Sequence, residues 1–180
     1  MYGLAFVTVI AGLILIGLGM LLLLLPGRAL AWLARFPRDI AAGRILTTLA
    51  MAWAVWMLLH ARINWVDEHR NLVWMLAPAA WLLIIMFMDE LLAVRALGGL
   101  LLLAPMPILD AAFLEATPWR LVMVTLAYLL VIAGMVLVWS PYKFRTTVAR
   151  RLATPARCRA WGGAGLLCGL ALDVLALTAF

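Results

Sequence analysis

The sequence has few charged residues: only 12% are Asp, Glu, Lys or Arg, whereas 68% are hydrophobic. A chain of 180 residues with so little polar material cannot cover a water-soluble globule. It has two cysteines, Cys158 and Cys168, which form neither a CxxC nor a CxxCH pattern. A disulfide framework, a zinc site and covalently attached haem are therefore unsupported. GxSxG, HExxH and glycine-rich phosphate-loop patterns are also absent, and no nucleic-acid partner is expected.

What the sequence does contain is a series of apolar runs, at 4–25, 45–59, 72–88, 91–109, 121–139 and 161–180. Most approach the roughly 20 residues that a helix needs to cross a bilayer, whereas strands of a membrane barrel would alternate apolar and polar residues. We therefore predict an all-α integral membrane protein with about six transmembrane helices, in one polytopic domain over residues 1–180. The first run has no Lys or Arg before it and is expected to be a retained span, not a signal peptide.

A short charged stretch, FMDELLAVRALGG at 87–99, divides the longest apolar region, 72–109. As one helix this region would be about 57 Å long, nearly twice the hydrocarbon thickness. The chain must therefore turn, and we predict that Asp89 and Glu90 anchor the turn at a membrane interface, because carboxylates in hydrocarbon are costly. Arg95 is close enough to this interface to extend its guanidinium outward.

The distribution of basic residues predicts the orientation. Segments 26–44 and 140–160 are rich in Arg and Lys, which favours a cytoplasmic location for both. Four crossings between them place them on the same side, with both termini outside, and we expect a bacterial inner membrane. The short outer loops are 61–71 and 110–120. The basic residues of the second inner loop are expected to contact anionic lipid or a protein partner: Lys143, Arg145, Arg150, Arg151, Arg157 and Arg159.

A short interfacial helix is predicted after the first span. Ala29, Trp32 and Phe36 recur at i, i+3 and i+7 with arginines between them, a pattern typical of a helix whose apolar face lies in the headgroup region. Pro37 is expected to end or kink this helix.

Few side chains suggest chemistry. His60 and His69 fall near the outer end of the second helical hairpin, where two imidazoles at similar depth would suit a b-type haem; solvated loop histidines are the alternative. No cofactor or metal is predicted, while haem b or a quinone stays an open alternative. Asp173 lies within the last span, and intramembrane carboxylates are functional candidates. With Arg95 it could belong to an ion pathway, or it could make a helix contact.

Small residues predict close helix packing. Gly165 and Gly169 form a GxxxG pattern in the last span, and such residues allow helices to approach closely. Whether the neighbouring helix belongs to this chain or to another subunit stays open.

Two functions follow as hypotheses. The first is a non-catalytic subunit or assembly factor of a larger bacterial inner-membrane complex, since the chain has little extramembrane mass and no reactive constellation. Its partners would be the bilayer, including anionic lipids, and other membrane subunits or further copies of itself. The alternative is a small transporter or channel for protons or small solutes that uses Asp173. An enzymatic role is less favoured.

Overall fold

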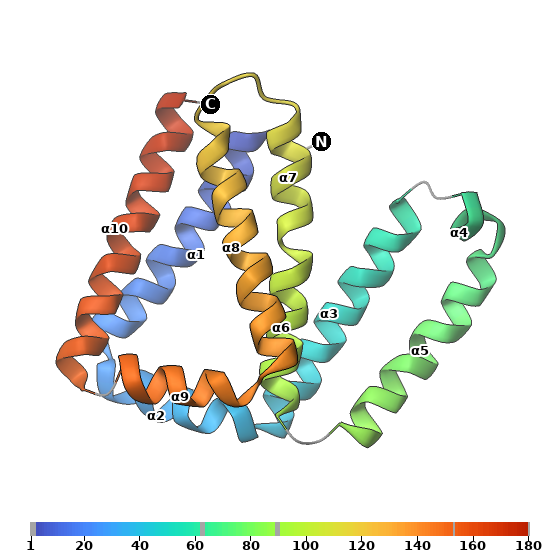
Figure 1. Ribbon diagram of the computed structural model, residues 1–180, viewed down its shortest axis with the longest axis horizontal. Coiled ribbons are helices and arrows are strands. Elements are labelled where there is room, and N and C mark those ends of the chain that lie inside the picture. The colour runs from blue at the N-terminus through green and yellow to red at the C-terminus, as the bar shows by residue number, and fades with distance from the viewer. Residues whose placement is uncertain (1–2, 62–63, 89–90, 153, 180) are drawn as a thin grey trace.

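The computed structural model describes residues 3–61, 64–88, 91–152 and 154–179, apart from the side chain of Trp65, and every regular element in these ranges is a helix (Figure 1). The elements are α1 (Leu4–Leu24), α2 (Pro26–Arg35), the 3-10 helix η1 (Phe36–Arg38), α3 (Ile40–His60), α4 (Asn64–Glu68), α5 (Arg70–Phe87), α6 (Leu92–Leu103), α7 (Pro105–Phe113), α8 (Arg120–Trp139), α9 (Tyr142–Arg151) and α10 (Pro155–Ala179). Six helical stretches are long and apolar enough to cross a membrane, with α6 and α7 counting as one. The predicted all-helical fold is confirmed over these ranges, together with six helical stretches long and apolar enough to span a membrane.

The third and fourth spans separate where the charged stretch predicted a turn. Helix α5 ends at Phe87 and α6 begins at Leu92. Leu91, which precedes α6, has a φ of 57°, a left-handed conformation that is uncommon for a leucine. Asp89 and Glu90 lie outside the described residues, so their role as turn anchors stays a prediction.

The fourth span is longer than its apolar run suggested. It continues from Leu92 to Phe113 across the junction at Pro105, where α6 gives way to α7. Pro105 has no N–H to donate, which explains why the helix is interrupted there. Asp110 therefore belongs to the last turns of α7, not to the outer loop in which the sequence analysis had placed it.

Helices α1 and α10 pack as an antiparallel pair through two reciprocal glycine contacts. A Cβ on Gly12 would lie 2.9 Å from the carbonyl oxygen of Gly169, and a Cβ on Gly169 would lie 2.7 Å from that of Gly12. Gly19 and Gly162 form the same relationship at 2.7 and 2.8 Å. The nearest contact for a Cβ on Gly165 is 3.8 Å away, which is ordinary packing. Hence the close approach uses glycines spaced seven apart, and only Gly169 of the predicted GxxxG takes part.

A second glycine pair joins α6 to α8. A Cβ on Gly98 would lie 3.0 Å from the carbonyl oxygen of Gly134, and a Cβ on Gly134 would lie 2.8 Å from that of Gly98. The other side of α6 packs on α3, where a Cβ on Gly43 would lie 3.1 Å from the Ala93 nitrogen. Helix α6 is thus enclosed by two neighbours, which gives the fourth span the largest buried share of the six.

Helices α2 and α9 lie side by side across one end of the bundle, hereafter the basic end (Figure 1). Pro37 does end α2, since the chain continues as η1. Phe36, however, is only 4% exposed and packs on Phe144 of α9 at 5.7 Å between ring centroids. Phe36 therefore does not lie on the exposed apolar face that was expected, and neither does Ala29, which is 2% exposed; of the three residues only Trp32, at 55%, is exposed.

Helix α5 stands at one side of the bundle, with α3 between it and α6 (Figure 1). Only 6% of the most apolar stretch of α5 is buried, compared with 39% for the fourth span. Trp81 of α5 donates a hydrogen bond to the hydroxyl oxygen of Thr48 in α3, at 2.9 Å. Much of the apolar surface of α5 is thus left without a protein neighbour in this chain.

Candidate functional site

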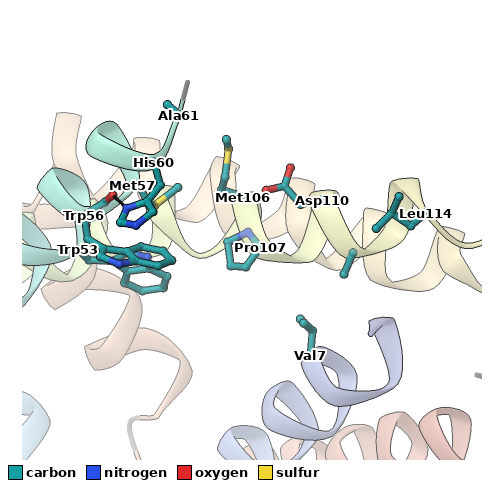
Figure 2. Close-up of a pocket in the computed structure, with 11 residues that line it drawn as sticks. Val7, Trp53, Trp56, Met57, His60, Ala61, Met106, Pro107, Asp110 and Leu114 are labelled. Atoms are coloured by element: carbon teal, nitrogen blue, oxygen red, sulfur yellow. Dashed lines mark hydrogen bonds between the residues drawn. The ribbon is translucent and has the colours of Figure 1, made fainter. Parts of the chain in front are cut away.

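A cavity of about 500 Å³ opens between α3, α7 and the start of α1, toward the end of the bundle opposite the basic end (Figure 2). It exists because α6 packs along α3, whereas α7 packs against α8 and α1 beyond the Pro105 junction. Helices α3 and α7 therefore diverge, and a wedge-shaped space is left between them. Its lining is mostly apolar and consists of Val7, Trp53, Trp56, Met57, His60, Ala61, Met106, Pro107, Asp110, Ala111 and Leu114.

The histidine of this cavity has a defined tautomer. Nδ1 of His60 lies 2.7 Å from the carbonyl oxygen of Trp56, one turn earlier in α3. A carbonyl only accepts hydrogen bonds, so Nδ1 carries a proton, and in the neutral form of the ring Nε2 is the acceptor. The imidazole also packs on the Trp56 ring, with centroids 4.8 Å apart. Backbone and ring together hold His60 in place.

Asp110 is the second ionisable residue in the lining, and it was not among the residues predicted from the sequence. The apolar run had been ended at 109 because Asp110 is acidic. The signal that could have placed it in the span is the apolar sequence that follows, Ala111 to Leu114, which continues the helix for another turn. Asp110 is exposed on the open side of the cavity.

Of the two histidines that suggested a haem site, only one lines the cavity. His60 lines the cavity, whereas His69 directly precedes α5, beyond the short helix α4, and does not belong to the lining. No group of three His, Cys, Asp or Glu side chains suited to a metal ion gathers within the part of the chain that the structure describes.

Asp173 lies at the interface between α10 and α1. Its carboxylate faces Gly12, and its Oδ1 atom is buried without a hydrogen-bond donor among the described residues. Thr8, one turn before Gly12, is fully buried, but its hydroxyl donates to the Leu4 carbonyl at 2.7 Å. The carboxylate is thus held by helix packing, in a place where a charge is costly.

Arg95 and Asp173 do not share a site. Arg95 lies in the first turn of α6, near the basic end, and its Nε atom is buried without an acceptor among the described residues. Asp173 lies on α10 about 9 Å from its C-terminal end, at the other end of the bundle (Figure 1).

The basic residues gather at one end. Those of the second basic segment are all exposed: Lys143, Arg145, Arg150, Arg151, Arg157 and Arg159. The guanidinium of Arg151 lies over the Trp161 ring, 5.3 Å from its centroid. Because α2 brings its own exposed arginines alongside α9, the two basic segments share one end, as the even number of crossings predicted.

No protein-family model, curated protein or solved structure matches the chain. Its function has to be inferred from its own residues and their arrangement.

Proposed function

We propose that the chain is a non-catalytic subunit or assembly factor of a larger complex in a bacterial inner membrane. The observation that carries this proposal is the exposure of α5, which packs on α3 but not on the four remaining spans. With 6% of its most apolar stretch buried, α5 has almost no protein neighbours except α3. A second protein packed against this hairpin would give it the enclosure that α6 already has.

Exposed apolar surface alone does not require a partner, because lipid tails cover such surface equally well. What favours a protein neighbour is the kind of side chain on α5. Met75 and Met86 are 72% and 70% exposed, and methionine adapts to irregular partner surfaces. The α3–α5 hairpin therefore supports a docking role more than a role in a closed carrier.

The basic end would face the cytoplasm, with both termini outside. In this orientation α2 and α9 lie in the headgroup region, where their exposed arginines and Lys143 contact anionic lipids. The contact between Phe36 and Phe144 would hold the two helices as one surface.

The test is purification from native membranes in a mild detergent, which is expected to yield stoichiometric partner proteins. Bulky substitutions on α5, Met75→Trp and Met86→Trp, should reduce the amount of partner recovered. The matched control is Ile132→Trp on α8, which changes a side chain of similar exposure, 58%, elsewhere on the apolar surface. Two results together would contradict the proposal: purification of the chain alone as a monodisperse species, and α5 variants with the same thermal stability as the unmodified chain.

The second candidate is a small carrier or channel for protons or small solutes. It is favoured by one observation, the buried Oδ1 of Asp173 without a donor among the described residues. Such an atom suits a carboxyl group that gains and loses a proton or cation. Ion flux in proteoliposomes separates this candidate from the first.

A further inference from the structure

We propose that the cavity between α3 and α7 binds an amphiphile with a hydroxylated aromatic head group, the chemistry of an isoprenoid quinol. The cavity volume of about 500 Å³ falls within the range of small-molecule sites. This binding role is separate from the proposed function, and neither depends on the other.

The position of the cavity suits a ligand that arrives from the membrane. Helices α3 and α7 diverge, so the cavity opens sideways between two spans and is not sealed inside the bundle. Trp56 and Met106 on its walls are 57% and 49% exposed, which marks the open side. A hydrophobic molecule dissolved in the bilayer could therefore enter without crossing water.

Both polar side chains of the lining lie near the ends of their helices, where the apolar Ala61 and Leu114 also line the cavity. His60 is the last residue of α3, and Asp110 lies one turn before the end of α7. Trp53 and Met106 lie deeper, toward the middle of the spans (Figure 2). A ligand with a polar head and an apolar tail matches this order, with the head near the helix ends.

The two polar groups both accept hydrogen bonds. In its neutral form the His60 ring offers the lone pair of Nε2, because Nδ1–H is already donated to the Trp56 carbonyl. An ionised Asp110 carboxylate only accepts. The head group that satisfies both must therefore donate, as the two hydroxyls of a quinol do, whereas the carbonyls of a quinone do not.

The aromatic walls favour a planar head group. The indoles of Trp53 and Trp56 lie close together on one wall of the cavity, in the view of Figure 2. Aromatic rings prefer offset or tilted stacking on such surfaces. A phospholipid phosphate is disfavoured because it would bring a negative charge toward Asp110.

The experiment compares three ligands on the purified protein in nanodiscs, by calorimetric titration without oxygen. The ligands are decyl-hydroquinone, its dimethyl ether and decyl-benzoquinone, which differ in whether they can donate. We expect the hydroquinone to bind about tenfold tighter than the other two, because those leave acceptors unpaired. Equal affinity for all three, or no binding, would overturn the proposal.

Variants locate the site. His60→Phe and Asp110→Leu should each lower the affinity for the hydroquinone toward that of the ether. Glu115→Leu is the matched control, since this carboxylate lies near the same end but outside the cavity lining, and it should leave affinity unchanged. Decyltrimethylammonium, a cation with the same tail, serves as a fourth ligand. If this cation binds as tightly as the hydroquinone and displaces the hydroquinone, the cavity is a cation site and the proposal is wrong. The ligand comparison on the unmodified protein stands even where a variant folds poorly.

Discussion

The carboxylate of Asp173 on α10 lies directly against Gly12 on α1. Gly169, one turn before Asp173, is also in contact with Gly12, so the absence of a side chain at position 12 makes room for a backbone and a carboxylate together. Since Oδ1 of Asp173 is buried there without a donor among the described residues, the packing of α1 on α10 and the chemistry of Asp173 depend on the same glycine.

Gly12→Ala is therefore expected to weaken the α1–α10 pair. The added Cβ would lie 2.7 Å from Asp173 Cγ and 2.9 Å from the Gly169 carbonyl oxygen, and such overpacking costs about 1–3 kcal/mol. The matched control on the same helix is Gly17→Ala, because a Cβ at Gly17 meets nothing within 4 Å. Unfolding in mixed detergent micelles measures both. Equal stability of the two variants would show that α1 and α10 do not approach this closely.

Substitutions of Asp173 separate the two proposed functions. Asn keeps the size of the carboxylate but cannot ionise, so Asp173→Asn should preserve assembly with partner proteins. Asp173→Leu adds a branched side chain against Gly12 and should impair assembly. Copurification and ion flux in proteoliposomes are the two readouts. We expect no flux from the unmodified chain, whereas a robust flux that Asn abolishes would favour the carrier.

The spans were predictable from sequence because their signal is local. Helix length and hydropathy define each apolar run by itself, and the costly pair Asp89 and Glu90 indicated the break before Leu92. Pro37 ended α2 as expected, since proline acts on its own helix. Each of these predictions depends only on the local sequence, and not on which helices are neighbours.

The contacts between spans were not predictable in the same way. Gly12 and Gly169 come from opposite ends of the chain, and no local pattern reveals that their helices pair. Phe36 is buried because α9 brings Phe144 to it, and α9 was expected to be a loop. The cavity around Asp110 depends on the divergence of α3 and α7, which follows from the packing of α6 on α3 and of α7 on α8 and α1.

Leu91 offers a test of backbone strain at the turn before α6. Its φ of 57° is a left-handed conformation that costs an L-residue about 1–2 kcal/mol and a glycine almost nothing. Leu91→Gly should therefore equal or exceed the unmodified chain in thermal stability. Leu91→Val should lower it, because a β-branched side chain tolerates this region least. Greater stability of the valine variant would contradict a left-handed Leu91.

Labelling of introduced cysteines tests the orientation on which the proposed function depends. The background variant carries Cys158→Ala and Cys168→Ser, which remove both native thiols. Two separate variants of it then carry one new thiol each at an exposed position, Thr147→Cys or Ala116→Cys. Thr147 lies in α9 at the basic end, whereas Ala116 lies between α7 and α8 at the opposite end. An impermeant maleimide applied to spheroplasts should label position 116 and not position 147 until the membrane is opened, since the positive-inside rule predicts a cytoplasmic α9. Labelling of position 147 in intact spheroplasts, with position 116 protected, would show that the orientation is the reverse of the predicted one. Equal labelling of both positions would contradict the six-span arrangement.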